Sequence, residues 1–299
     1  MIKQQNMHLG FRQKVKDFIL TMRPKQWIKN AFVFAGLIFS KSFMNLALIL
    51  RSIYAFILFS LVSGIVYIIN DIIDRDKDKL HPLKAKRPIA SGRLKPDEAI
   101  IPALVILCAV IFASYKLDFL FFIIIFTYFL LILFYSIILK NIVILDVVII
   151  SVGFVLRTLA GTAIIRVEIS PWLIMCTTFL ALFLALNKRK NELILLSEDA
   201  ANHRKNLEQY TPELIDQMLT VVSSATIMSY SLYTFTSGKS HYMMLTIPFV
   251  LYGIFRYQYL VSSGNDGGSP EIVLLKDLPL IINIILWGIT SIIIVFFFY

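Results

Sequence analysis

Long apolar runs dominate this chain and set its architecture. Stretches of about 20 residues, the length that crosses a hydrocarbon core, recur from residue 30 to the C-terminus. We predict about nine spanning helices, or eight if one of them is re-entrant. The predicted spans are 30–50, 52–70, 98–115, 118–138, 142–165, 171–187, 214–236, 242–262 and 278–298. Such long and uniformly apolar runs do not suit barrel strands, so the pattern predicts an all-α, polytopic membrane helix bundle.

Polar and basic positions gather in three segments between these runs. They are residues 1–29, the loop at about 71–97 and the loop at about 188–213. With nine spans, all three segments lie on one face of a single integral membrane domain covering residues 1–299. The other face holds few basic residues: Lys41, Arg51, Lys116, Arg166 and Lys239. Cytoplasmic loops carry an excess of Lys and Arg, so we predict that the N-terminal segment and both long loops face the cytoplasm.

Composition supports the membrane interpretation and narrows the partners. Hydrophobic residues make up 58% of the chain and charged residues only 16%, whereas a soluble domain carries about a quarter charged residues. The formal net charge of +10 suits anionic lipid or phosphate. We expect no nucleic acid partner, because no soluble module is present to bind one. Cys108 and Cys176 lie in apolar runs and are expected to be core residues.

An acidic motif follows the second apolar run. If the helix continues through it, Asp71, Asp74 and Asp78 share one face, with Asn70 beside Asp74. Carboxylates near membrane depth are costly and usually functional, and several on one stripe repel each other unless a cation neutralises them. Because Mg²⁺ binds through one or two carboxylates plus substrate phosphate oxygens, we predict a divalent metal site. The alternative is a solvated acidic helix end.

Basic residues on both sides of this motif suit a phosphate or diphosphate ligand. Lys84 and Arg87 follow it in a segment made rigid by prolines, and the alternative there is a simple topology signal. Arg23, Lys25 and Lys29 precede the first apolar run, where they would either clamp a lipid phosphate or only set the topology.

Further charges stand inside or at the ends of later apolar runs. Lys140 is a helix-end cation, and we predict that it and Arg157 bind substrate. Asp146 and Arg157, 11 residues apart, share a helix face, and they either line a polar chamber or form structural pairs. In the loop at about 188–213, Lys188, Arg189 and Glu192 would form a second phosphate-binding edge or, alternatively, an intrahelical pair.

These motifs together resemble a known family. The NDxxDxxxD pattern after the second span, with RPKQWIKN, FVLRTLAG, NKRKNE and GGSPE in order, resembles the UbiA superfamily of membrane prenyltransferases. It is most similar to the decaprenyl-phosphate phosphoribosyltransferase branch. Members of the superfamily typically carry a second DxxxD motif between spans six and seven. Here that place holds Lys188, Arg189 and Glu192, which suits a phosphoribosyl donor with an additional 5-phosphate better than an isoprenyl diphosphate.

The resemblance implies an activity and assigns roles. The implied reaction moves 5-phosphoribose from PRPP to a polyprenyl phosphate at a cytoplasm-facing site in a bacterial-type inner membrane. The implied roles are catalysis by Asp71, Asp74 and Asp78, Mg²⁺ binding by these three and Asn70, and donor binding by Lys84, Arg87, Lys188, Arg189 and Glu192. The choice between Mg²⁺ and Mn²⁺, the acceptor's chain length and the oligomeric state stay open.

Two other functions stay open at this point. An isoprenyl transferase of the same superfamily would act on an aromatic or quinone precursor and would not use PRPP. An anion transporter is disfavoured, because the acidic motif lies at a helix end and transport sites usually lie near the bilayer midplane.

Overall fold

The computed structural model describes residues 10–40, 42–80, 84–195, 209–236, 240–263, 273 and 276–298. Within these ranges all regular structure is helical, and no strand occurs. The predicted all-α class is therefore confirmed.

Seven helical segments of the described chain are long and apolar enough to cross a membrane. They are α3 (Leu46–Ile73), α5 (Pro96–Leu117), α6 (Phe119–Ile137), α7 (Leu145–Ile165), α8 (Pro171–Leu195), the segment His241–Ser262 that joins η6 (His241–Thr246) to α11 (Ile247–Ser262), and α13 (Leu278–Phe298). These correspond to seven of the nine predicted spans. Large apolar side chains such as Phe112 and Phe126 are exposed on them, as expected for helices that contact lipid. The chain is an integral membrane protein.

The two remaining predicted spans differ from the others. The run at 214–236 forms one continuous helix, α10 (Pro212–Thr236), but it buries the hydroxyl residues Ser223, Thr226 and Ser229 and is not among the seven. The run at 30–50 does not form one helix. It is divided into η1 (Pro24–Phe34), α2 (Ala35–Phe39) and η2 (Ser42–Met44), followed by the start of α3. The number nine is thus approximate.

Close backbone packing against α7 accompanies the division of this first segment. A Cβ atom on Gly161 of α7 would lie 1.9 Å from the carbonyl oxygen of Val33, and one on Gly36 would lie 2.6 Å from Thr162 Cγ2. Small residues allow helices in membranes to approach this closely. Asn30 of η1 also donates hydrogen bonds to Ser60 and Ser63 of α3, so η1 is tied to both neighbours.

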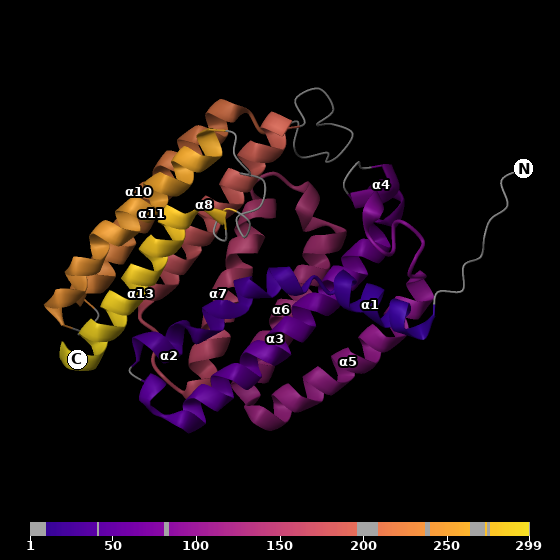
Figure 1. Cartoon of the computed structure of the whole chain (residues 1–299), viewed down its shortest axis with the longest axis horizontal. Helices are drawn as coiled ribbons and strands as arrows, with labels where there is room; N and C mark the ends of the chain where they lie inside the picture. Colours follow the sequence, from indigo (N-terminus) through magenta and orange to yellow (C-terminus); the bar gives the residue numbers. More distant parts are fainter. Residues whose placement is uncertain are drawn as a thin grey trace, which may run out of the picture.

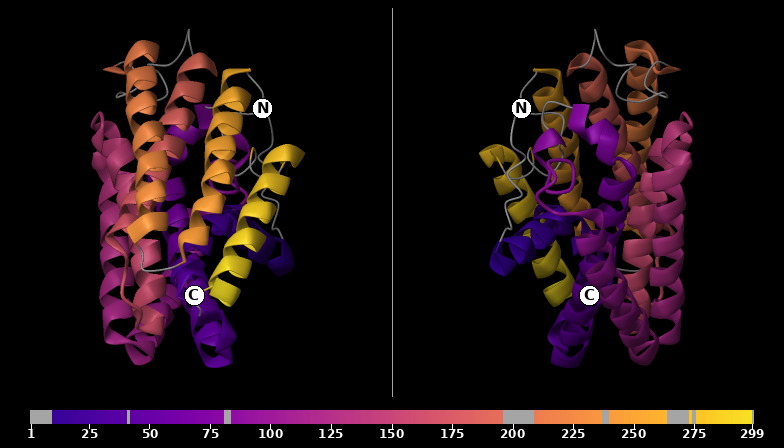
Figure 2. Two further views of the ribbon diagram at one scale, coloured as in Figure 1. Left: turned by 90° about the vertical axis from the view of Figure 1, so that its left-hand side faces the viewer. Right: turned by 90° about the vertical axis from the view of Figure 1, so that its right-hand side faces the viewer.

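The helices form a bundle (Figures 1 and 2), and the residues that the structure describes include three clusters of buried apolar side chains. One core joins α3, α5, α6 and η1 and contains Phe59 and Phe121; a second joins α7, α8, α10 and α11 around Phe183. A third, smaller core contains Phe39 of α2 and Tyr233 of α10. The short helices α4 (Arg75–Leu80) and η3 (Lys84–Lys86) follow the C-terminal end of α3 (Figure 1). The candidate site lies at this end of the bundle.

Candidate active site

The acidic motif occupies the junction between α3 and α4. The α3 helix ends at Ile73, and Asp74 is its C-cap residue, with its backbone N–H 2.9 Å from the Asn70 carbonyl oxygen. The predicted continuous helix is therefore interrupted. Asp71 belongs to α3, Asp74 to the junction and Asp78 to α4. As a result, the condition for the three carboxylates to share one helix face, a helix that continues through the motif, is not met, and they form two groups.

The first group joins Asp71 and Asp78 through an arginine. Arg87 Nη1 lies 3.1 Å from Asp71 Oδ1 and 2.5 Å from Asp78 Oδ2. Asp71, only 2% exposed, also accepts a hydrogen bond from Arg23. The Arg23 guanidinium lies 4.7 Å from the centre of the Tyr67 ring, a cation–π contact. Two buried carboxylates therefore meet at one position, which a guanidinium nitrogen fills.

The second group is centred on Lys140. This lysine lies in η4 (Leu139–Asn141), between α6 and α7, and is only 8% exposed. Its Nζ atom is 2.7 Å from both carboxylate oxygens of Asp74 and 3.4 Å from Asn70 Oδ1. Asn70 and Asp74 thus lie side by side, and an element 66 residues away supplies their cation.

Charge balance characterises the whole acidic site. Three carboxylates face three cations: Arg23, Arg87 and Lys140. Such pairing is needed where charges are removed from water. In the part of the chain that the structure describes, no set of three or more acidic, His or Cys side chains is already gathered for a metal ion.

The donor atoms nevertheless suit one kind of metal. Asp71 and Asp78 offer hard oxygen ligands at a shared position, and Mg²⁺ needs only one or two carboxylates when phosphate oxygens complete its shell. The residues fit Mg²⁺ if Arg87 turns away from that position. Asp74 as arranged here faces Lys140 instead.

A second cluster lies nearby, at the start of α7 and the end of α8. Arg189, 2% exposed, donates from Nε to Asp146 Oδ2 at 2.7 Å and from Nη1 to Glu192. Tyr210 donates to Asp146 Oδ1 at 2.7 Å and accepts from the backbone N–H of Ile144 at 2.8 Å. Burial, reinforced by the hydrogen bond to Asp146, raises the pKa of the Tyr210 phenol, so it stays a donor. This network ties α7, α8 and the start of α10 together, and the intrahelical pair of Arg189 and Glu192 is present.

Arg157 lies deeper in the bundle and apart from Asp146. Its Nε donates to Asn30 Oδ1 and its Nη2 to Tyr128 OH, both at 2.7 Å. Its guanidinium also lies 4.9 Å from the ring centres of Tyr128 and Phe154. The described chain shows it bound by neutral and aromatic groups. The predicted chamber shared by Asp146 and Arg157 is not seen, because each residue has its own partners.

The remaining predicted substrate-binding residues are four lysines, in η1, η3 and α8. Lys25 is exposed at the start of η1, and Lys29 donates to Gln26 at 2.5 Å. Lys84 is half-buried, and its carbonyl oxygen accepts from the backbone N–H of Arg87. Lys188 is half-buried beside Arg189 in α8. The roles of these four lysines in substrate binding stay predictions.

Known proteins with similar sequences decide the family. Residues 30–276 match the UbiA prenyltransferase family. The chain belongs to this family. Among its relatives, the decaprenyl-phosphate phosphoribosyltransferase of Corynebacterium glutamicum is 33% identical over 283 residues, which cover 90% of this chain and 83% of the relative. The protein of the same name from Mycolicibacterium smegmatis is 31% identical over 291 residues, covering 91% and 90%.

Solved structures of the UbiA family share the fold. A UbiA homolog from Archaeoglobus fulgidus bound to GPP and Mg²⁺ superposes with a TM-score of 0.72 at 19% identity, covering 93% of this chain and 99% of the other. The same homolog bound to DMAPP and Mg²⁺ gives a TM-score of 0.71 at 18% identity, covering 94% and 99%. The predicted resemblance to the UbiA superfamily, and to its decaprenyl-phosphate phosphoribosyltransferase branch, is thus confirmed, and the chain is a transferase.

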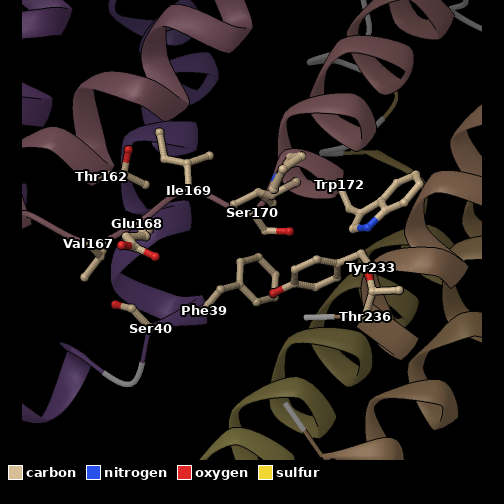
Figure 3. A pocket seen from close by; sticks show the side chains of 13 residues that line it. Phe39, Ser40, Thr162, Val167, Glu168, Ile169, Ser170, Trp172, Tyr233 and Thr236 are labelled. Atoms are coloured by element: carbon tan, nitrogen blue, oxygen red, sulfur yellow. The ribbon is translucent and has the colours of Figure 1, made fainter. Parts of the chain in front are cut away.

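This UbiA family member also contains a cavity far from the acidic site. It has a volume of about 540 Å³ and lies between the end of α7, the start of α8 and the end of α10, whereas the acidic site lies near the start of α7. Figure 3 shows the rings of Phe39 and Tyr233 pointing toward one another, with Trp172 beside them. The ring centres of Phe39 and Tyr233 are 5.6 Å apart. No residue predicted for the site lines this cavity.

Sequence reasoning does not connect several residues to their places. Arg23 is predicted either to clamp a lipid phosphate or to set the topology, but it binds Asp71. The partners Tyr210 and Tyr128 do not stand out in the sequence, and Asn30 does so only as the end of the RPKQWIKN motif. Each meets its partner across a sequence separation of 29 residues or more. The available signal is local, because the RPKQWIKN motif begins with Arg23 and ends with Asn30.

Proposed function

We propose that this chain transfers 5-phosphoribose from PRPP to a polyprenyl phosphate and releases pyrophosphate. The observation that carries the proposal is the meeting of Asp71 and Asp78 at one cation-filled position, with Arg23 bound to Asp71 and Lys140 bound to the neighbouring Asp74. Acidic groups for a metal and basic groups for phosphates are what a diphosphate donor needs. The relatives named decaprenyl-phosphate phosphoribosyltransferase support this choice of donor and acceptor.

The proposed metal is Mg²⁺, and Mn²⁺ would find the same oxygen ligands. The A. fulgidus homolog is bound to Mg²⁺ together with GPP or DMAPP. Here Asp71 and Asp78 would hold the ion, with Asp74 and Asn70 beside them. When bound, it would withdraw negative charge from the departing pyrophosphate.

The basic residues change partners when the donor enters. Arg23, Arg87 and Lys140 neutralise carboxylates in the structure, and they would donate to phosphate oxygens once the metal takes the carboxylates. Lys84 and Lys188 extend this basic rim toward the donor's 5-phosphate. Arg189 and Glu192 act on the rim indirectly, since both are paired next to Asp146.

The chemistry needs positioning more than proton transfer. The C1–O bond to pyrophosphate breaks, and its electron pair leaves with the pyrophosphate, so C1 gains oxocarbenium character. An oxygen of the lipid phosphate attacks C1 from the opposite face and forms the new C1–O bond. Because this nucleophile is already an anion, no general base is required, and the residues contribute by orientation and charge stabilisation.

The placement of the site follows the basic residues. The excess of Lys and Arg around the acidic motif supports a site that faces the cytoplasm from a bacterial-type inner membrane. Lys25 and Lys29 lie in η1, shortly after Arg23 in the sequence, and would bind the phosphate of the acceptor lipid. The whole chain, residues 1–299, would work as one membrane domain.

The deciding experiment supplies the purified protein with radiolabelled PRPP and a polyprenyl phosphate. We expect a labelled lipid and released pyrophosphate. Asp78→Asn should remove this product, because Asp78 shares the cation position with Asp71. Asp76→Asn is the matched control, since Asp76 is exposed and pairs only with Lys79 among the described residues; it should keep the activity. A labelled lipid formed equally by both variants would contradict the proposal.

A second candidate function follows from the family. The structural relatives bind GPP and DMAPP, and the protoheme IX farnesyltransferase of Rickettsia felis is 29% identical over 261 residues, covering 85% of this chain and 78% of the relative. An isoprenyl transferase would accept a polyprenyl diphosphate and an aromatic or quinone precursor and would ignore PRPP. Anion transport, the third candidate, would move solute across proteoliposomes without any covalent product.

A further inference from the structure

Several polar side chains of the N-terminal helix α1 (Phe11–Thr21) are turned toward the protein. Lys14 Nζ lies 2.7 Å from Glu98 Oε1 in the first turn of α5. Asp17, fully buried, lies 3.6 Å from Arg93 and accepts a hydrogen bond from Gln13 at 3.3 Å. These contacts fix the rotation of α1 about its own axis.

The opposite face of α1 is apolar and exposed. Phe11, Val15 and Ile19 follow one another at a spacing of four residues, and 83%, 41% and 48% of their surfaces are exposed. Arg12 and Lys16 adjoin this row and are exposed too. A helix that buries Asp17 and exposes a row of apolar side chains is the reverse of what water favours, so this row needs an apolar environment.

The position of α1 along the membrane-spanning helices identifies that environment. Its contacts are with Arg93 and Glu98, where the membrane-spanning helix α5 begins, and Figure 1 shows α1 beside the start of α5. At its C-terminal end, Met22 packs against Gly64 of α3. The exposed row therefore lies at the level where hydrocarbon meets headgroups, the place taken by interfacial helices with basic flanks.

We infer that α1 is an interfacial helix that inserts Phe11, Val15 and Ile19 into the membrane and binds anionic lipid headgroups through Arg12 and Lys16. Basic residues near a membrane surface are attracted by anionic lipids, which matches the charge of this face. The inference does not depend on the proposed reaction. It adds a lipid contact on a helix that ends two residues before Arg23, the partner of Asp71.

The test measures the depth of α1 in nanodiscs made with the full chain. Cys108 and Cys176 are replaced by Ser, and a nitroxide label is attached through Val15→Cys. Two further labels calibrate the scale: Phe112→Cys on the lipid-exposed face of α5 and Lys77→Cys on exposed α4. We expect position 15 to resemble position 112 in its ratio of collisions with oxygen and with a water-soluble nickel complex.

A second arm tests the headgroups. Adding phosphatidylglycerol to phosphatidylcholine nanodiscs should place the label at position 15 deeper in the membrane. Removing each basic charge should weaken the affinity of α1 for the anionic membrane surface about five-fold. The variant is Arg12→Gln with Lys16→Gln; the control is Arg51→Gln, exposed at the other end of α3, which should not change the depth of the label.

Collisions at position 15 like those at position 77 would overturn the inference. Spin–spin broadening would do so too, by showing that a second copy covers α1. Depth independent of phosphatidylglycerol would overturn the headgroup assignment.

Discussion

Arg87 joins two carboxylates that belong to different helices. Its Nη1 atom bridges Asp71 of α3 and Asp78 of α4, although the role predicted for Arg87 is to bind phosphate. Both roles are compatible, because a guanidinium that neutralises acids in the absence of substrate can turn to phosphate oxygens when substrate enters. The acidic motif is visible in the sequence. The sequence does not assign the cations Arg23 and Lys140 to it, because nothing local links them with residues 48 and 66 positions away.

Replacing Arg87 with Ala should weaken donor binding. A hydrogen bond to a charged group contributes about 1.5–3 kcal/mol, so we expect the apparent KM for PRPP to rise roughly 10- to 100-fold. Steady-state kinetics with varied PRPP measures the effect. Lys79→Ala is the control, since Lys79 forms an exposed pair with Asp76 that contributes little. An unchanged KM in Arg87→Ala would argue against phosphate binding by this residue.

At the scale of single elements, η1 departs most from the sequence prediction. Within the run at 30–50, the polar residues from Ser40 to Asn45 mark the break before α3, for which Asn45 is the N-cap. No such polar residues separate η1 from α2, so the pattern does not reveal that division. The structure shows direct backbone contact between Val33 and Gly161, more than a hundred residues apart in sequence. Periodicity reports which face of a helix is apolar, and it does not report how closely two backbones approach.

Gly161→Ala should displace η1 from α7. The new Cβ would lie 1.9 Å from the Val33 carbonyl oxygen, so backbone must move. Overpacking of this kind typically costs about 1–3 kcal/mol, and we expect a lower midpoint of thermal unfolding in detergent. Gly288→Ala in α13 is the matched control, because a Cβ atom added there would have no neighbour within 4 Å among the described residues. Equal midpoints for the two variants would contradict the described packing.

The element α8 carries two neighbouring basic residues for which we predict opposite behaviour. Arg189→Ala leaves Asp146 buried without its ion partner, which should cost about 3–5 kcal/mol and appear as lost thermal stability. Lys188→Ala should mainly raise the KM for PRPP. Thermal unfolding and kinetics on both variants separate the two effects. A stable Arg189→Ala variant with a raised KM would restore the direct donor-binding role that the sequence suggests for Arg189.

For the whole molecule, the apolar pattern is a good guide and the predicted site is a partial one. Seven predicted spans form membrane-crossing helices, because lipid exposure demands long apolar runs whatever the packing. The site is assembled from the ends of several helices: η1 supplies its preceding residue Arg23, α3 and α4 supply the acids, and η4 supplies Lys140. Only the acidic motif can be recognised from the sequence, because its residues lie in one short segment.

Charge balance across the assembled site predicts how the metal binds. Because three cations already compensate Asp71, Asp74 and Asp78, a divalent ion alone would leave excess positive charge. We expect Mn²⁺, used as a paramagnetic probe, to bind at least roughly 10-fold more tightly when pyrophosphate is present. Electron paramagnetic resonance titration of free Mn²⁺ measures this after correction for the Mn²⁺–pyrophosphate complex in solution. Equal affinity with and without pyrophosphate would show that the cations do not oppose the metal.

The anchoring of η1 reaches further than its own packing. Arg157 grips Asn30 in the bundle interior, and Arg23 stands seven residues earlier, roughly 14 Å away along a 3₁₀-type rise. Because η1 is fixed at Asn30 near its C-terminal part, its position also determines where Arg23, at its N-terminal end, is located. Substitutions at position 157 or 161, far from the acidic residues, should therefore lower the turnover rate as active-site substitutions do. The reason is that they would displace Arg23 from Asp71 although every acidic residue is intact.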